Sequence, residues 1–440
     1  MSRKPKQQRN MNFCGSSDHG LSRRGFLGAA AGAAAFAADM TVLDVLKNPA
    51  LAGELKKQQK FVILLWLAGG ASQLETWDPK PGRPTGGPFA AIKTAVPGIE
   101  ICELLPKMAQ RLQHTAIIRS LNTRIGDHGG GSKLMHIGRR AEAAIEFPDL
   151  GAIVSRELGR ADSQVPDYVS IYSVTEGRQW GKGTSGFLGA RHAPMFLTES
   201  MVPANIQRTK SVSAVDHKER AELRKLLAQR FSQGRNRGVV ASHNSAYQRV
   251  RGIMASEKLF DVSQEPAAMR AKYGPTQFAE QCLIARRLAE AGVPFVKVGR
   301  AWWDSHGQNF ETHRELCADL DHAMSTLLDD LQDRGLLEHT LVLTLAEFGR
   351  TPRINGSLGR DHFANAWSAT LSGCGIKGGT VYGKTDADGN TVADGELKAG
   401  DLFATIYQAL GIDHEKEYYV GARPIPITDF GCKPVSDVLA

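Results

Sequence analysis

Residues 61–67 read Phe-Val-Ile-Leu-Leu-Trp-Leu, and this run decides the fold class. It is apolar at every position, whereas a strand with one solvated face would alternate apolar and polar residues. Near-continuous apolarity is typical of a strand covered on both faces, as in a parallel sheet with helices on either side. We therefore predict a buried parallel strand over 61–67.

Four other short runs have the same character and predict further buried strands. They cover residues 115–118 (TAII), 168–172 (YVSIY), 294–298 (PFVKV) and 341–345 (LVLTL). Between the last two, from about residue 309 to 332, apolar residues recur at spacings of three and four and predict an amphipathic helix. Strand, helix and strand in this order imply a right-handed crossover. The fold class we predict is α/β, a sandwich with a mostly parallel central sheet and helices on both faces.

The first 37 residues have the pattern of a targeting segment. Residues 22–27 (SRRGFL) precede the small, apolar run 28–38, and residues 35–37 offer an A-x-A type cleavage site. We predict a twin-arginine signal peptide over 1–37, recognised by the twin-arginine translocase, and a periplasmic or secreted protein. The alternatives are an uncleaved anchor and an ordinary Ala-rich helix, although the run is only about half the roughly 20 residues that a membrane-spanning helix requires.

The mature chain is expected to form one domain. Residues 38–440 are numerous enough to bury a large core without disulfide bridges, and none of their stretches is long and apolar enough for a transmembrane segment. Residues 201–274 differ from the rest, because they are charged, have helical patterns and carry few strand signals. We predict a helical insertion there, with a solvated outer face.

Net charge and cysteine content give no support for nucleic-acid binding, a disulfide framework or a thiolate metal site. The chain has a formal net charge of +8, but residues 1–37 hold six Arg and Lys against one Asp, so the mature part carries only +3. This small excess gives no reason to infer a nucleic-acid partner. The five cysteines outside the leader are scattered, with no Cys-x-x-Cys pair, which argues against a disulfide framework and against a thiolate metal site.

Polar clusters begin where three of the predicted strands end. They are residues 68–78 (AGGASQLETWD), 302–307 (WWDSHG) and 347–351 (EFGRT). Two more clusters, 126–132 (GDHGGGS) and 359–362 (GRDH), come after short loops. Ligands of open parallel sheets bind outside the carboxyl ends of the strands, so we expect these clusters to meet at one edge of the sheet.

The clusters supply carboxylate oxygens and imidazole nitrogens, a ligand set for zinc, manganese, iron or calcium-like ions. Asp304 and His306 form the most specific pair, because alternate residues of an extended segment point the same way and can share one ion. The alternative for each cluster is a helix cap or a turn. His128 either faces a substrate or finishes a loop. His313 lies on the apolar stripe of the 309–332 helix, which favours a core histidine over a ligand.

Longer strings in the same regions resemble a known family. They are residues 69–81 (GGASQLETWDPKP), 127–129 (DHG) with 134–138 (LMHIG), 285–288 (ARRL), 303–307 (WDSHG), 347–352 (EFGRTP) and 359–362 (GRDH) with 366–367 (AW). Together with the Arg-Arg leader they resemble the exported bacterial domain-of-unknown-function family fifteen-oh-one, which is grouped with the alkaline phosphatase and sulfatase superfamily. The resemblance covers nearly the whole mature chain and implies an alkaline-phosphatase-like sandwich.

The superfamily resemblance also implies a two-metal site at the strand ends and a nucleophile at a helix start. The implied metal ligands are Asp304, His306, Glu347, Asp361 and His362, with Glu75 or Asp78 in place of the first-strand aspartate. Ser132, or else Ser72, takes the position of the nucleophile. Two departures bear on the chemistry: Glu347-Phe348 stands where the superfamily has an adjacent Asp-His pair, and no Cys-x-Pro-x-Arg sulfatase signature occurs.

Two functions fit these observations. The first is an exported hydrolase in which a divalent metal ion (zinc, manganese or calcium) polarises a phosphate or sulfate ester of a small molecule or polysaccharide and activates Ser132 or a water. Arg350 or Arg360 would balance charge on the transition state, because guanidinium groups suit tetrahedral oxyanions, and His128 is a further catalytic candidate. The second is a non-catalytic exported binding module that keeps the sheet and a structural ion.

Overall fold

Strand β1 (Phe61–Leu67) lies inside an eight-stranded sheet of order β12-β4-β11-β8-β1-β7-β5-β6, and all of its residues are buried. It pairs in parallel with β7 (Phe295–Arg300) on one side and with β8 (Thr340–Leu345) on the other. The computed structural model describes residues 59–440 apart from gaps at 161–162, 164, 172–182, 199–200, 204–210, 234–243, 245–246, 248–249, 253 and 255–256. The predicted signal peptide therefore lies outside the described residues.

Seven strands of the sheet run in one direction and β11 (Trp367–Gly373) runs against them. Beyond β7, strands β5 (Tyr168–Ile171) and β6 (Met195–Leu197) continue in parallel, and β12 (Thr380–Tyr382) is parallel to β4 (Thr115–Leu121). Strand β11 is antiparallel to both β4 and β8. The five apolar runs all form strands of this sheet, so the mostly parallel sheet is confirmed.

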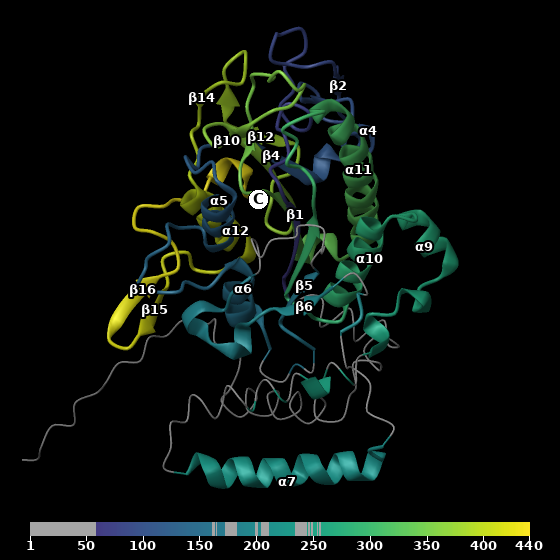
Figure 1. The fold of residues 1–440 in the computed structure, drawn as a ribbon, viewed down its shortest axis with the longest axis vertical. Coiled ribbons are helices and arrows are strands. Elements are labelled where there is room, and N and C mark those ends of the chain that lie inside the picture. Colours follow the sequence, from purple (N-terminus) through teal and green to yellow (C-terminus); the bar gives the residue numbers. More distant parts are fainter. Residues whose placement is uncertain are drawn as a thin grey trace, which may run out of the picture. The chain divides into compact units, whose positions relative to one another are not determined.

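Helices cover both faces of the sheet, which confirms the layered α/β architecture. Figure 1 shows α10 (Gln277–Glu290) and α11 (Asn309–Asp333) on one side of the strands, with α5 (His128–Ile137), α6 (Leu150–Leu158) and α12 (Ala399–Leu410) on the other. The helix predicted over 309–332 is α11, and its inward residues Leu320, Met324 and Leu327 are fully buried.

The described parts of the 201–274 segment include helices and irregular stretches. Helix α7 (Ala214–Ser232) begins at a capping box formed by Ser213 and Asp216, and α9 (Ala267–Tyr273) follows later in the chain. The outer face of α7 is not purely polar, because Leu223, Leu226 and Leu227 are exposed.

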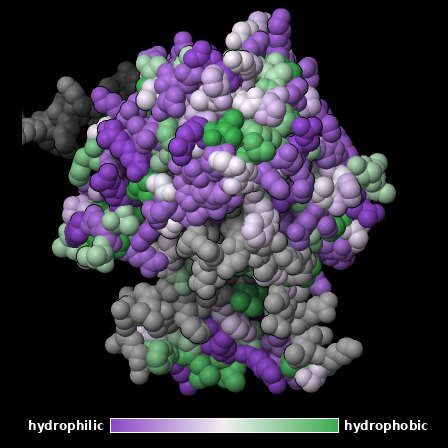
Figure 2. Space-filling model, turned by 45° about the horizontal axis from the view of Figure 1, so that its top comes forward, coloured by the Kyte–Doolittle hydropathy of each residue, from purple (hydrophilic) through white to green (hydrophobic). Residues whose placement is uncertain are grey.

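The face of the protein in Figure 2 is mostly hydrophilic, with small, separate hydrophobic areas. Within the described ranges, no helix has both the length and the apolar content needed to cross a membrane.

Candidate metal centre

The carboxyl ends of three neighbouring strands place the site. Because β8, β1 and β7 are adjacent and parallel, the loops that follow them leave the same edge of the sheet. The loops also touch: the backbone N–H of Gly69 donates to Oε1 of Glu347 at 2.9 Å. Gly69 has φ +106°, and a Cβ there would lie 2.4 Å from the backbone nitrogen of Asp304, so only glycine lets these loops approach so closely. The clusters that follow β1, β7 and β8 therefore lie at one edge of the sheet.

Helix α5 brings His128 to this edge. Asp127 caps the helix by accepting from the N–H of Gly130 at 2.8 Å, and His128 is the first helical residue. Gly131 allows the helix to approach the loop after β8, because a Cβ there would lie 2.9 Å from the carbonyl oxygen of Glu347. Gly131 therefore serves a close approach of two backbones.

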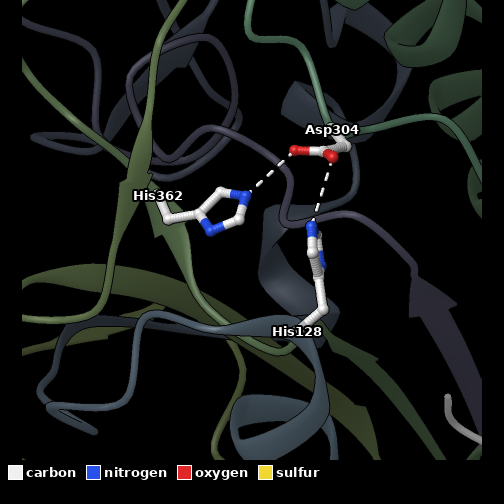
Figure 3. A group of neighbouring side chains, drawn as sticks. All are labelled: His128, Asp304 and His362. Atoms are coloured by element: carbon white, nitrogen blue, oxygen red, sulfur yellow. Dashed lines mark hydrogen bonds and ion pairs between the residues drawn. The ribbon is translucent and has the colours of Figure 1, made fainter.

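Two ring nitrogens of His128 face two carboxylates. Nε2 lies 3.2 Å from Oδ2 of Asp304, and Nδ1 lies 2.8 Å from Oε1 of Glu347. Figure 3 shows His128 and His362 pointing at Asp304 from different elements. His362 belongs to β10 (His362–Phe363), which pairs with β9 (Gly349–Arg350), and its Nε2 lies 3.1 Å from Oδ1 of Asp304.

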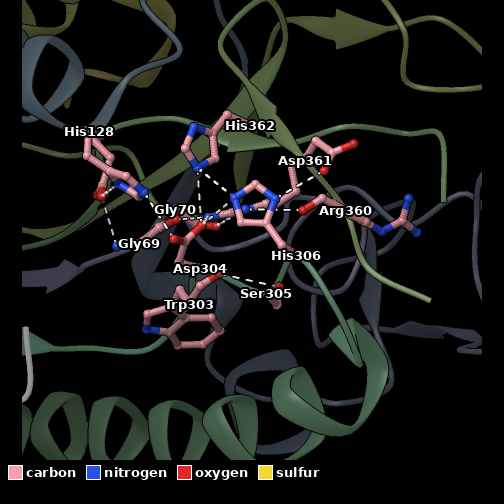
Figure 4. Close-up of polar contacts among 12 residues, drawn as sticks. Gly69, Gly70, His128, Trp303, Asp304, Ser305, His306, Arg360, Asp361 and His362 are labelled. Atoms are coloured by element: carbon pink, nitrogen blue, oxygen red, sulfur yellow. Dashed lines mark hydrogen bonds and ion pairs between the residues drawn. The ribbon is translucent and has the colours of Figure 1, made fainter. Parts of the chain in front are cut away.

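His306 completes the cluster from the loop that also carries Asp304. Its Nε2 lies 3.1 Å from Oδ1 of Asp304 and 3.0 Å from Nε2 of His362 (Figure 4). The side chains of Asp304 and His306, the pair noted in the sequence, therefore lie in contact with each other. We call His128, Asp304, His306 and His362 the histidine–aspartate cluster.

The spacing and chemistry of this cluster fit a transition-metal ion. Facing ligand atoms of His128, Asp304 and His362 all lie within 4.8 Å of one another. Bonds of about 2.0–2.1 Å in a tetrahedral zinc site separate ligand atoms by ~3.3 Å, and the contacts of the three histidines with Asp304 measure 3.1–3.2 Å. Imidazole nitrogens with one carboxylate suit zinc, whereas calcium prefers a shell made only of oxygens.

Opposite charges hold Asp304 in its ionised form. Burial raises its pKa, but hydrogen bonds from His128, His362 and Arg350 outweigh this effect and hold the pKa well below the ordinary value. Arg350 is fully buried and donates from Nη2 to Oδ1 of Asp304 at 2.5 Å and from Nε to the carbonyl of Gly70 at 3.0 Å. Arg350 therefore fixes the orientation of the Asp304 carboxylate.

The pKa of His128 favours the doubly protonated, cationic ring when no ion is bound. Burial lowers its pKa, but its hydrogen bonds with Asp304 and Glu347 more than offset this and raise the pKa to about 9. At pH 7 both ring N–H groups then donate to the two carboxylates. An ion bound through Nε2 must displace one of these protons.

The cluster is open on one side. The side chains of Asp304 and His306 are 38% and 48% exposed, whereas that of Glu347 is 4% exposed. A ligand can therefore approach from the side of Asp304 and His306, while Glu347 closes the inner side.

Three residues that the sequence suggests for the site, Glu75, Asp78 and Arg360, lie in other contacts. Glu75 and Arg360 are both fully buried and form an ion pair at 2.7 Å, and the remaining guanidinium donors of Arg360 go to carbonyl oxygens of Thr85, Thr351 and Pro352. Asp78 pairs with Lys80 at 2.9 Å. Neither Glu75 nor Asp78 belongs to the group of facing ligand atoms found among the described residues.

The two serines considered as nucleophiles are buried. Ser132 lies on α5 one turn after His128 and is 4% exposed, and its carbonyl oxygen accepts from Nδ1 of His136. Ser72 is fully buried, and its backbone N–H donates to Nε2 of His313 at 2.9 Å. His313 is itself fully buried, so its prediction as a core histidine is confirmed.

Sequence reasoning named His128 but not its place beside Asp304. A signal was present, because Asp is a preferred N-cap residue, and an N-cap at Asp127 puts His128 at the first helical residue. The backbone carbonyl of Gly126, which accepts from Nδ1 of His362 at 2.8 Å, had no signal in the sequence.

Comparison with known proteins gives one family match. Residues 59–439 match the model of a family described as a protein of unknown function (DUF1501), which confirms the resemblance noted in the sequence. No curated protein matches the chain.

Solved structures with a similar arrangement have low identity to this chain. They include the PsFucS1 sulfatase from Pseudoalteromonas sp. (TM-score 0.38, 12% identity, covering 84% of this chain and 71% of that one). A protein in the alkaline phosphatase superfamily from Vibrio parahaemolyticus has a TM-score of 0.35 at 11% identity, covering 80% and 67%. The phosphonate monoester hydrolase of Agrobacterium radiobacter has a TM-score of 0.35 at 11% identity, covering 86% and 76%.

Proposed function

We propose that this chain, which belongs to the DUF1501 family of proteins of unknown function, is an exported metal-dependent hydrolase of phosphate or sulfate esters. One observation carries the proposal: Nε2 of each of His128, His306 and His362 lies 3.1–3.2 Å from a carboxylate oxygen of Asp304, beside the carboxyl ends of parallel strands. Ligands of such sheets bind at this edge. Small molecules and polysaccharides that carry phosphate or sulfate esters are the proposed substrates.

The histidine–aspartate cluster would hold a divalent ion, with zinc favoured by its nitrogen-rich ligands. Such an ion supplies Lewis acidity toward an ester oxygen and makes a water a better nucleophile near neutral pH. Asp304 contributes the negative charge that balances the ion, and Arg350 keeps this carboxylate ionised and oriented.

The open side of the cluster is where a substrate would approach. Asp304 and His306 are the exposed members, so an ester oxygen would reach the ion past them. Ser132 is almost fully buried, which favours a water over this serine as the nucleophile. The imidazole of His306 is the most exposed of the three, so an ester that reaches the ion would lie beside this ring.

A non-catalytic binding module with a structural ion is the second candidate. The observation that favours it is that Arg350 and Arg360 are both fully buried and hydrogen-bonded within the protein. Neither guanidinium is placed to stabilise the charge on a transition state. A binding module would keep the ion and lack turnover.

The test is turnover of 4-nitrophenyl phosphate and 4-nitrophenyl sulfate by the purified chain in the presence of zinc or manganese. We expect turnover in the parent and a loss of at least about 100-fold in Asp304→Asn, the size typical of removing a transition-state interaction or ligand. Asp333→Asn is the matched control, because this carboxylate is 69% exposed on α11. A parent that binds the ion and turns over neither ester contradicts the hydrolase and supports the binding module.

A further inference from the structure

The three histidines of the cluster share one arrangement: each turns Nε2 inward and Nδ1 toward an acceptor. Nδ1 of His128 faces Oε1 of Glu347 at 2.8 Å, Nδ1 of His306 faces Oδ1 of Asp361 at 3.0 Å, and Nδ1 of His362 faces the carbonyl oxygen of Gly126 at 2.8 Å. A carbonyl oxygen can only accept, so Nδ1 of His362 carries a proton and its Nε2 is left for a ligand.

We infer that Glu347 and Asp361 are positioning residues and not metal ligands, and that the cluster binds a single ion through Nε2 of the three histidines and Asp304. This inference rests on the proposed metal-dependent function. It departs from the superfamily resemblance, which implies two ions with Glu347 and Asp361 among their ligands.

Glu347 is placed to fix the orientation of His128. Its Oε1 accepts from two groups, the N–H of Gly69 at 2.9 Å and the ring of His128 at 2.8 Å. The two nitrogens of an imidazole lie on opposite sides of the ring, so an ion at Nε2 would have the ring between it and Oε1 of Glu347. A carboxylate behind a metal-binding histidine fixes the tautomer and makes the ligand more basic.

Asp361 holds His306 in the same way, on the exposed side of the cluster. Oδ1 of Asp361 accepts from Nδ1 of His306 and from Nδ2 of Asn355 at 3.2 Å. Asn355 in turn donates to the carbonyl oxygen of His306 at 2.9 Å, so the side chain and the backbone of His306 are both held. Without these contacts an exposed imidazole would sample several rotamers.

The two-ion arrangement would depend on one atom, Oε2 of Glu347. Oε2 of Glu347 is buried and has no hydrogen-bond partner among the described residues. A second ion, if the chain bound one, would find a ligand there. The stoichiometry of the metal therefore distinguishes the single-ion arrangement from the two-ion arrangement.

The experiment measures bound metal per chain by elemental analysis and zinc affinity by competition with a chromogenic chelator. The proteins are the parent, Glu347→Gln, Glu347→Ala, Asp361→Asn, Asp361→Ala, and the control Asp333→Asn. We expect one ion in the parent. We expect one ion with about 10–100-fold weaker affinity in Glu347→Ala and Asp361→Ala, the range found when an outer partner of a ligand is removed. Glu347→Gln keeps an oxygen acceptor for His128, so it should bind more tightly than Glu347→Ala.

The outcomes separate this inference from the proposed function. Two ions in the parent, with one lost in Glu347→Gln or Asp361→Asn, overturn the positioning role and leave the hydrolase standing. A parent without any ion overturns both. Equal affinity in Glu347→Gln and Glu347→Ala, both weaker than the parent, would also overturn the positioning role, because an orienting contact is kept by the amide. Circular dichroism of each variant checks that it is folded.

Discussion

Nε2 of His306 and Nε2 of His362 lie 3.0 Å apart, and each lies 3.1 Å from Oδ1 of Asp304. Two neutral imidazoles repel each other when their lone pairs face, so this contact requires a shared proton or a cation between the rings. A divalent ion satisfies both rings and the carboxylate together. These contacts bring the sequence cluster around residue 304 together with the cluster around residue 362.

The buried ion pair of Arg360 and Glu75 should contribute to the stability of the fold and not to catalysis. Both are fully buried, so Arg360→Met leaves an unpaired carboxylate and should lower the free energy of unfolding by about 3–5 kcal/mol. The control is Arg83→Met, which breaks an exposed pair with Asp388 and should leave stability unchanged. Urea denaturation measures both. If the two variants proved equally stable, the structural role of Arg360 would be wrong.

His313 should make stability depend on pH. Burial lowers its pKa from 6.5 to about 4, so the unfolded chain binds this proton more readily than the folded one. The contribution of His313 is complete above pH ~6.5 and is lost as the pH falls toward 4. Between pH 7 and 4.5 the loss amounts to about 2 kcal/mol, since one pKa unit corresponds to about 1.4 kcal/mol.

The measurement compares the parent with His313→Gln. Denaturant unfolding at pH 7 and at pH 4.5 gives the loss of stability for each protein, and the other titrating groups are common to both. We expect the parent to lose about 2 kcal/mol more than the variant. An equal loss in the two proteins would show that His313 is protonated in the folded state.

Trp302 should carry backbone strain next to the cluster. It has φ +75° and its side chain is 61% exposed. A positive φ destabilises a non-glycine residue by roughly 1–2 kcal/mol, so Trp302→Gly should be more stable than Trp302→Ala by about 1 kcal/mol. Tyr419, exposed on β15 (Glu417–Val420) with an ordinary φ, is the control, and there the glycine variant should be the less stable one. If the glycine and alanine variants had the same order of stability at Trp302 and at Tyr419, backbone strain at Trp302 would be refuted.

The parallel core of the fold was predictable because its strands are apolar at nearly every position. β1 and α11 match the sequence prediction to within a residue. Strand β11 gave no such signal, because it reads Trp-Ser-Ala-Thr-Leu-Ser-Gly. Its buried hydroxyls are satisfied by neighbouring strands, with Thr370 bonded to Thr344 at 2.6 Å and Ser372 to Thr115 at 2.8 Å. Such pairings depend on sheet order, which a sequence does not show.

The place of the site was predictable, but the division of roles was not. Asp304 and His306 were recognisable as candidate ligands because they follow a strand, and His362 was a candidate through the superfamily resemblance. Whether a carboxylate faces the open centre or the back of a ring depends on loop packing, as the contacts of Glu347 with Gly69 and His128 illustrate. Glu75 was also ambiguous, because its partner Arg360 lies 285 residues away in the chain.

Export should depend on the paired arginines of the N-terminal segment. Replacing Arg23 and Arg24 with lysines should stop the processed protein from appearing outside the cytoplasm, because the translocase recognises the arginine pair and not the charge alone. Arg3→Lys with Arg9→Lys is the matched control and should be exported as the parent is. Cell fractionation with detection of the shortened chain measures this. Unchanged export of the Arg23 and Arg24 variant would contradict the twin-arginine assignment.

The most direct test of the metal centre is the melting temperature of the purified chain with and without a chelator, together with elemental analysis. An ion bound only by the folded state stabilises it by mass action, so the chelator should lower the melting temperature of the parent. It should leave Asp304→Asn and His362→Ala, which start from the lower value, unchanged. Should the chelator have no effect on the parent, and elemental analysis find no divalent ion in it, the metal centre is wrong.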